Sequence, residues 1–133
     1  MIEAVQKTGL CRTEGAESVH CIDSAKALDF INLDTDLYRE ICSMFLVDAP
    51  DQLRDIHKAL QEADTKTLLL KSHTLRSSSG SVGAETMQKI AGSIEEAVRR
   101  KDIMVLPKLV SCLQAESEKV FAELRRMVDD TGQ

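Results

Sequence analysis

Apolar residues recur three or four positions apart along most of the chain, and no stretch alternates strictly between apolar and polar residues. This spacing brings apolar side chains to one face of an α-helix, because each residue of a helix is turned by about 100° from the last. The longest such stripe lies near the C-terminus and comprises Leu106, Leu109, Val110, Leu113, Val120, Leu124 and Met127. The pattern therefore predicts an all-α protein.

Proline, glycine and capping residues divide this pattern into segments. Pro50 is expected to break or kink a helix, because its ring disfavours helical conformation in the residue before it, and Gly80 and Gly83 signal the end of another helix. The stripe expected to face the core ahead of Pro50 consists of Leu37, Ile41, Met44 and Phe45. The expected elements are, in chain order, a short helix around 24–30 capped by Asp23, a helix capped by Asp34 or Thr35, a helix after Pro50, a helix capped by Asp64, a helix over about 84–100 and a last helix opened by Asp102. We expect an antiparallel up-down four-helix bundle with one or two short additional N-terminal helices.

Length and composition indicate a single domain. The chain has 133 residues, of which 43% are hydrophobic and only 3% aromatic. Such a chain suits one core of helices packed through aliphatic side chains. Residues 1–22 show no sustained period and are expected to form a flexible linker or N-terminal extension, which leaves the bundle domain at 23–130.

Charge and cysteine content exclude several classes of function. A formal net charge of −5 argues against nucleic acid and against an anionic membrane as partners. The four cysteines form no CxxC pair, and the sequence shows no signal peptide and no long apolar run, so we expect reduced thiols in a cytoplasmic protein. Cys11, His20 and Cys21 fit no known spacing of metal ligands, and no metal site is expected.

One histidine, His73, has a setting that suggests chemistry. If the segment from about 65 to 80 is helical, Leu68 and Leu75 lie on the side opposite His73, which therefore points towards water. An exposed neutral imidazole can attack phosphorus near physiological pH, cations beside it can stabilise phosphoryl oxygens, and exposed leucines and small residues offer a partner a docking surface. The residues within about 60° of the direction of His73 are Lys66, Leu69, Leu70, Arg76, Ser77 and Gly80.

The segment 73–84 resembles the signature of the histidine-containing phosphotransfer (HPt) domains of bacterial multistep phosphorelays. That signature is a histidine, any residue, an aliphatic residue, lysine, glycine, small residues, and then glycine followed by alanine or leucine. The matching run here is His73-Thr74-Leu75-Arg76-Ser77-Ser78-Ser79-Gly80-Ser81-Val82-Gly83-Ala84. The resemblance covers about residues 23 to 128. Arg76 replaces the usual lysine, which keeps the charge but changes the donor geometry, and Ser77 replaces the usual glycine.

This resemblance implies a phosphocarrier. His73 would accept a phosphoryl group from the aspartyl phosphate of a response-regulator receiver domain and pass it to an aspartate of another receiver, with a hybrid sensor kinase as a further candidate partner. Arg76 would stabilise the phosphoryl charge. Mg²⁺ would be held by the receiver, so this chain would bind no cofactor, and the absence of a GxxxxGK[ST] loop agrees with a domain that has no kinase activity of its own. We expect a monomer.

The next helix contributes a second part of the candidate site. Gly92 costs helix stability of about 1 kcal/mol relative to alanine, and close approach of the helix that bears His73 is a reason to accept that cost. Glu95 would then come within reach of the imidazole; in the resembling family, a glutamine or glutamate at the matching position often hydrogen-bonds the histidine. A carboxylate that accepts from Nδ1–H leaves Nε2 free to attack. The alternative for Glu95 is an ordinary solvated glutamate beside Glu96.

Two other functions fit parts of the sequence. The run Ser72–Arg76 faintly resembles the phosphoacceptor box of sensor kinases, but Thr74 stands where that box has an acidic residue and no nucleotide-binding domain follows. The other is a helical interaction module that binds a partner through Leu69 and Leu70 and whose histidine is never phosphorylated.

Overall fold

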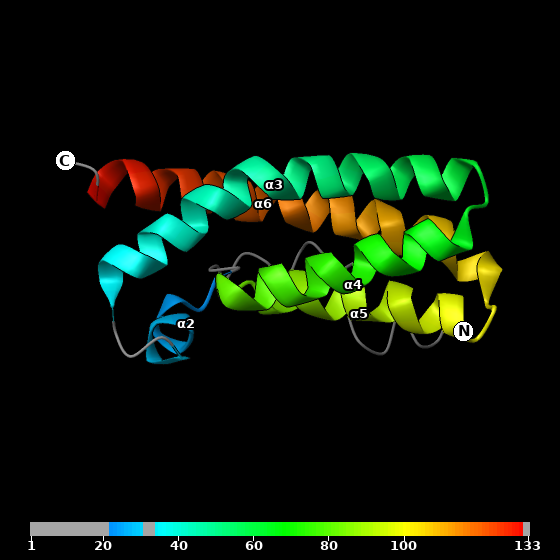
Figure 1. Cartoon of the computed structure of the whole chain (residues 1–133), viewed down its shortest axis with the longest axis horizontal. Coiled ribbons are helices and arrows are strands. Elements are labelled where there is room, and N and C mark those ends of the chain that lie inside the picture. The colour runs from blue at the N-terminus through cyan, green and yellow to red at the C-terminus, as the bar shows by residue number, and fades with distance from the viewer. Residues whose placement is uncertain (1–21, 31–33, 132–133) are drawn as a thin grey trace.

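The computed structural model describes residues 22–30 and 34–131, and these form helices without any strand. The elements are α2 (Ser24–Phe30), α3 (Thr35–Gln61), α4 (Thr65–Ser81), α5 (Glu85–Arg99), the 3-10 turn η2 (Ile103–Val105) and α6 (Leu106–Thr131). Each long helix packs against the preceding one, and α6 closes the bundle against α3. Figure 1 shows the four long helices running in alternating directions, with α2 at one end. The predicted all-α bundle is confirmed.

The core lies between the four long helices and is built from aliphatic side chains. Leu75 of α4, Ile94 of α5 and Leu124 of α6 are each 0% exposed. Burying one such side chain contributes about 1.5–3 kcal/mol. The predicted stripe of α6 lies in this core, with Met127 packed at its edge.

The first long helix differs from the sequence prediction in two ways. α3 continues through Pro50, so the predicted break is wrong and the alternative of a kink holds, since Figure 1 shows α3 bending along its length. The buried residues Ala49 and Leu53 on either side of the proline keep both halves on the core. Leu37 and Met44 are exposed, at 40% and 59%, and not buried as predicted. The face that meets the core is formed by Tyr38, Cys42, Phe45, Ala49, Leu53, Ile56 and Ala59.

Most of the predicted caps are present. Asp34 Oδ1 accepts from the backbone N–H of Leu37 at 2.9 Å, and Asp64 Oδ1 accepts from that of Thr67 at 3.1 Å. Asp102 makes no such bond, and α6 begins only at Leu106, after η2, so the predicted start of the last helix is wrong. The Asp64 cap fixes where α4 begins, and therefore which residues of α4 face outward.

Gly83 explains why α4 ends where it does. Its φ of 85° lies in the left-handed region that glycine adopts without strain. Its carbonyl accepts from the N–H of Asp23 at 2.7 Å, and a Cβ at this position would lie against the Asp23 carbonyl oxygen. Gly83 thus both ends α4 and lets the chain before α2 pack closely against this turn.

The cysteines differ from one another. Cys42 is a free thiol, and its burial in the core raises its pKa. Cys112 is disulfide-bonded, so the prediction of reduced thiols is wrong at that position, while Cys11 and Cys21 lie outside the described residues, as does most of the predicted linker at 1–22. Within 22–30 and 34–131, no helix combines the length and apolar character needed to cross a bilayer, and no acidic, histidine and cysteine side chains gather as a metal site.

Candidate phosphohistidine site

Helix α4 has a buried face and an exposed face, divided as the helical spacing predicts. Leu68 and Leu75 are 1% and 0% exposed, and two serines on the same side are fully buried. One of them, Ser79, satisfies its hydroxyl by donating to the Leu75 carbonyl oxygen at 2.7 Å. The side chain of His73 is 58% exposed on the opposite face. The imidazole is therefore accessible to a second protein.

The carboxylate of Glu95 reaches His73 from the neighbouring helix α5. Glu95 Oε2 lies 2.8 Å from His73 Nδ1. The Glu95 side chain is 1% exposed, whereas that of Glu96, one residue further on, is 54% exposed. The structure thus brings these two predicted site residues together, and Glu95 is not the solvated glutamate of the alternative interpretation.

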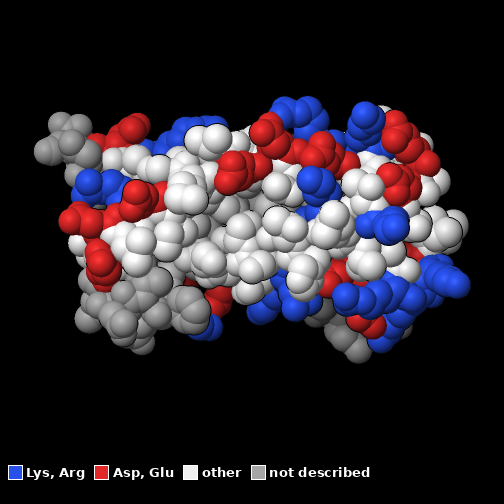
Figure 2. Space-filling view, in the orientation of Figure 1, with Lys and Arg blue, Asp and Glu red and all other residues white. Residues whose placement is uncertain are grey.

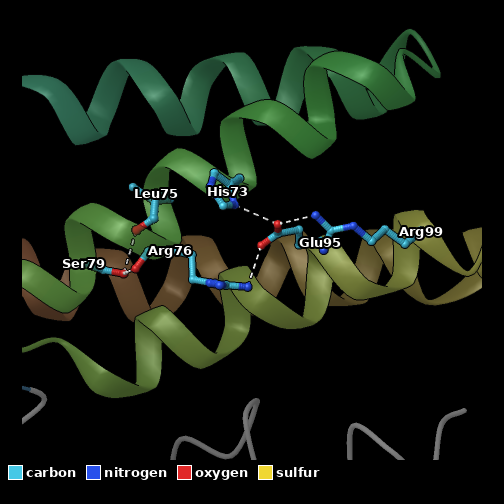
Figure 3. A network of polar contacts seen from close by, with 6 residues as sticks. All are labelled: His73, Leu75, Arg76, Ser79, Glu95 and Arg99. Atoms are coloured by element: carbon cyan, nitrogen blue, oxygen red, sulfur yellow. Dashed lines mark hydrogen bonds and ion pairs between the residues drawn. The ribbon is translucent and has the colours of Figure 1, made fainter.

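Two arginines bind the same carboxylate. Arg76 Nη1 of α4 lies 3.0 Å from Glu95 Oε1, and Arg99 Nη2 of α5 lies 2.9 Å from Glu95 Oε2. Figure 3 shows the carboxylate between the two guanidinium groups, with the imidazole of His73 also directed towards it. Arg99 was not among the predicted site residues, although its spacing of four residues from Glu95 is that of a helical ion pair.

Gly92 sets the path of the Arg76 side chain. A Cβ at this position would lie 3.3 Å from Cδ of Arg76, which is closer than an ordinary contact. The stem of Arg76 therefore crosses α5 over the glycine on its way to Glu95. The close approach of α4 and α5 that Gly92 predicted is present.

The charges around Glu95 decide its protonation state and the tautomer of His73. Burial by itself would raise the pKa of Glu95, but the hydrogen bond from His73 and the positive charge of Arg76, with a further contribution from Arg99, outweigh it and hold that pKa below its ordinary value. An ionised carboxylate can only accept hydrogen bonds. In the neutral imidazole, Nδ1 therefore carries the hydrogen and Nε2 carries the lone pair.

The exposed side of the site is a shallow hollow of about 400 Å³. Its lining residues are His73, Arg76, Ser77, Gly80, Ser81 and Gln88. Of the predicted docking residues, Ser77 and Gly80 thus lie in the hollow with His73, while Lys66, Leu69 and Leu70 lie outside it on the earlier turns of α4. Leu70 is 60% exposed and Leu69 is half-buried.

A second, mostly apolar groove of about 210 Å³ lies between α3 and α4. Met44 and Gln52 line its α3 side, and Thr74 and Ser78, which follow His73 in sequence, line its α4 side. Figure 2 shows an uncharged band across the middle of the face on which α3 and α4 lie, with charged side chains around it. This surface was not predicted from the sequence, because Met44 was expected to face the core.

A family model and two solved structures that resemble the chain all bear the name of the same family. A family model described as "Hpt domain" matches residues 40–132. The crystal structure of the HPT domain from a Shewanella sensor hybrid histidine kinase is 26% identical, with a TM-score of 0.77 over 84% of this chain and 96% of that chain. The crystal structure of histidine-containing phosphotransfer protein B from Pseudomonas aeruginosa PAO1 is 24% identical, with a TM-score of 0.71 over 86% of this chain and 96% of that one, and shows the shared fold. No curated protein matches the chain.

Proposed function

The chain belongs to the Hpt domain family, and on that basis we propose that His73 is the residue that carries the phosphoryl group. The family membership makes the chain a histidine phosphocarrier of phosphorelay signalling. The observation that carries the assignment to His73 is its bond to Glu95: Nδ1 is held by a buried carboxylate, while the ring is more than half exposed. This leaves Nε2 as the nucleophile.

The proposed reaction requires no proton transfer. The Nε2 lone pair attacks the phosphorus of an aspartyl phosphate on a receiver domain, the bond between phosphorus and the aspartate oxygen breaks, and the aspartate leaves as a carboxylate. The ring keeps its Nδ1 hydrogen and gains positive charge. Glu95 stabilises that charge through the 2.8 Å hydrogen bond. The reverse sequence on another receiver returns the phosphoryl group to an aspartate.

Arg76 is the proposed cation for the phosphoryl oxygens. It lines the same hollow as His73, and its side chain is 46% exposed, so its guanidinium group is accessible to a group on Nε2. A guanidinium group suits phosphoryl oxygens because its donors form a planar fork. We propose that the acidic pocket of the receiver holds the Mg²⁺ that assists transfer. This chain would supply the nucleophile and a cation.

The receiver is proposed to dock on the uncharged band beside His73. Leu70 on α4 and Met44 and Val47 on α3 are exposed by 60%, 59% and 70%. A contiguous exposed apolar patch, as opposed to a single exposed apolar residue, marks a contact surface. Hpt domains pair with receiver domains of response regulators. For this chain we propose such receivers as partners, including that of a hybrid sensor kinase. We also propose that the chain is a monomer and acts in the cytoplasm.

Transfer from a phosphorylated receiver tests the proposed function. The purified chain should gain acid-labile phosphate in the presence of the receiver and Mg²⁺, and His73→Gln should gain none. A chain that stays unlabelled, while a control Hpt domain is labelled by the same receiver, would be an interaction module instead. Labelling by ATP and Mg²⁺ alone would favour the sensor-kinase alternative.

A further inference from the structure

Two neighbouring glutamates of α5 form the same pair with an arginine four residues later, in very different surroundings. Glu95 Oε2 lies 2.9 Å from Arg99 Nη2, and Glu96 Oε2 lies 2.7 Å from Arg100 Nε. Glu95 is 1% exposed and Glu96 is 54% exposed. A solvated pair contributes little to stability, whereas a carboxylate removed from water depends on its partners.

The partners of Glu95 divide between its two oxygens. Oε1 is bound by Arg76, and Oε2 is bound by both His73 and Arg99. Arg76 comes from α4 and lines the exposed hollow, whereas Arg99 comes from the same helix as Glu95 and is absent from the lining of that hollow. Arg76 therefore shares the hollow with a group on His73, whereas Arg99 does not line it.

Phosphorylation of His73 would give Arg76 two anionic groups to bind, the phosphoryl oxygens and the Glu95 carboxylate. If its guanidinium group moves to the phosphoryl oxygens, Oε1 of Glu95 loses its partner inside the protein. Leaving a buried carboxylate without a cation is strongly unfavourable. Besides the ring of His73, which becomes positive on phosphorylation, the remaining cation at that carboxylate among the described residues is Arg99.

We propose that Arg99 is a positioning residue that keeps the Glu95 carboxylate ionised and directed at His73 Nδ1 while Arg76 binds the phosphoryl group. The inference rests on the proposed function of His73. In the unphosphorylated protein both arginines hold Glu95, so loss of Arg99 is partly covered by Arg76. In the phosphorylated protein Arg99 is the arginine of the pair that still holds Glu95, beside the positively charged ring of His73, and its loss has the larger effect there.

The experiment compares Arg99→Gln with Arg100→Gln in the full chain. The two substitutions remove the same charge from adjacent positions at the C-terminal end of α5, but only the first removes a partner of Glu95. Arg99→Lys is the conservative variant, because lysine keeps the charge. Thermal unfolding of all variants establishes that each one folds. The probe is a phosphorylated receiver with Mg²⁺, followed by transfer from phosphorylated His73 back to the receiver.

Arg99→Gln should slow transfer from the receiver onto His73 about tenfold, the size expected from losing a hydrogen bond to a charged group. Arg100→Gln should match the wild type, and Arg99→Lys should recover most of the rate. The pH profile gives a readout that a merely structural role would not move. The charged and titratable groups that face Glu95 are His73 and Arg76 from α4 and Arg99 from α5. Removing one cation raises the pH at which Glu95 takes up a proton, so the acidic limb of the rate profile should move to higher pH in Arg99→Gln.

Equal rates and equal pH profiles for Arg99→Gln and Arg100→Gln would overturn the role of Arg99 while leaving the phosphocarrier function intact. A wild-type chain that accepts no phosphoryl group on His73 would instead overturn the proposed function itself. An unchanged rate in Arg99→Gln with an altered unfolding temperature would assign Arg99 to stability alone and also contradict the proposal.

Discussion

The two histidines that the structure describes lie on different helix pairs and have hydrogen bonds of nearly equal length. His57 of α3 has its Nε2 2.9 Å from the amide oxygen of Gln114 on α6. His73 of α4 has its Nδ1 2.8 Å from the carboxylate of Glu95 on α5. The Gln114 amide group donates in turn to Glu118, while the Glu95 carboxylate accepts from two arginines.

The difference shows that a histidine hydrogen bond alone does not make a phosphoryl site. An amide oxygen accepts from Nε2–H at His57, so in its neutral ring the nitrogen farther from the backbone is already protonated. At His73 the nearer nitrogen is engaged, and a charged partner can stabilise a ring that becomes positive. The functional distinction lies in which nitrogen is held and whether its partner carries charge.

Replacing each of the two histidines by glutamine, one at a time, tests the contrast with the largest expected effect. His73→Gln should abolish phosphoryl transfer from a receiver, because it removes the nucleophile. His57→Gln should transfer at the wild-type rate, since His57 contacts α6 and not the hollow around His73. Acid-labile radiolabel on the two variants measures the contrast, and loss of labelling in His57→Gln would contradict it.

The charge of the histidine's partner is tested by Glu95→Gln. The variant keeps the shape of the side chain but removes the negative charge that stabilises the phosphorylated ring, and transfer should slow by about tenfold to a hundredfold. Glu96→Gln is the matched control, because Glu96 pairs with Arg100 away from His73. Equal rates in the two variants would show that the carboxylate charge has no part in transfer.

Acid should reveal the same carboxylate through stability. The pKa of Glu95 is lowered in the folded protein from an ordinary value of 4.5. A depressed carboxyl pKa contributes stability that is complete above the unfolded-state pKa and is lost as pH falls through the folded-state pKa. The difference in unfolding free energy between the wild type and Glu95→Gln should therefore shrink below about pH 4.5. Denaturant titrations between pH 7 and pH 3 measure it, and a difference that does not change with pH contradicts the assignment.

Gly92→Ala should give the smallest effect, with rate and stability changing in opposite directions. The added methyl group would lie 3.3 Å from Cδ of Arg76, so the arginine must shift by a few tenths of an ångström. We expect transfer to slow about twofold to threefold, while helix propensity raises the unfolding free energy by up to about 1 kcal/mol. Single-turnover transfer and denaturant unfolding measure the two changes. A slower rate together with lower stability would mean that α4 and α5 have been pushed apart.

The parts of the site that depend on one helix were predictable from the sequence. Periodicity predicted that Leu68 and Leu75 face inward and that His73 faces outward, and these exposures follow from the geometry of a single helix. The contact between His73 and Glu95 depends on two helices, and sequence spacing offers only Gly92 as a sign of their approach.

The failures have physical reasons of the same kind. Met44 has the sequence spacing of a core-facing residue but lines the groove side of α3. Spacing alone does not decide which of two adjacent helix faces packs against the core. Pro50 stays within α3 because packing on both sides outweighs the lost hydrogen bond. Arg99 was missed because its pair with Glu95 has the same sequence spacing as the solvated pair of Glu96 and Arg100.

The most direct test of the central claim is nitrogen NMR of the imidazole groups before and after phosphorylation by a receiver. We predict that His73 carries its hydrogen on Nδ1 before transfer and the phosphoryl group on Nε2 after it, with the signals of His57 unchanged. Phosphorylation at Nδ1 of His73, or at His57, would contradict the account.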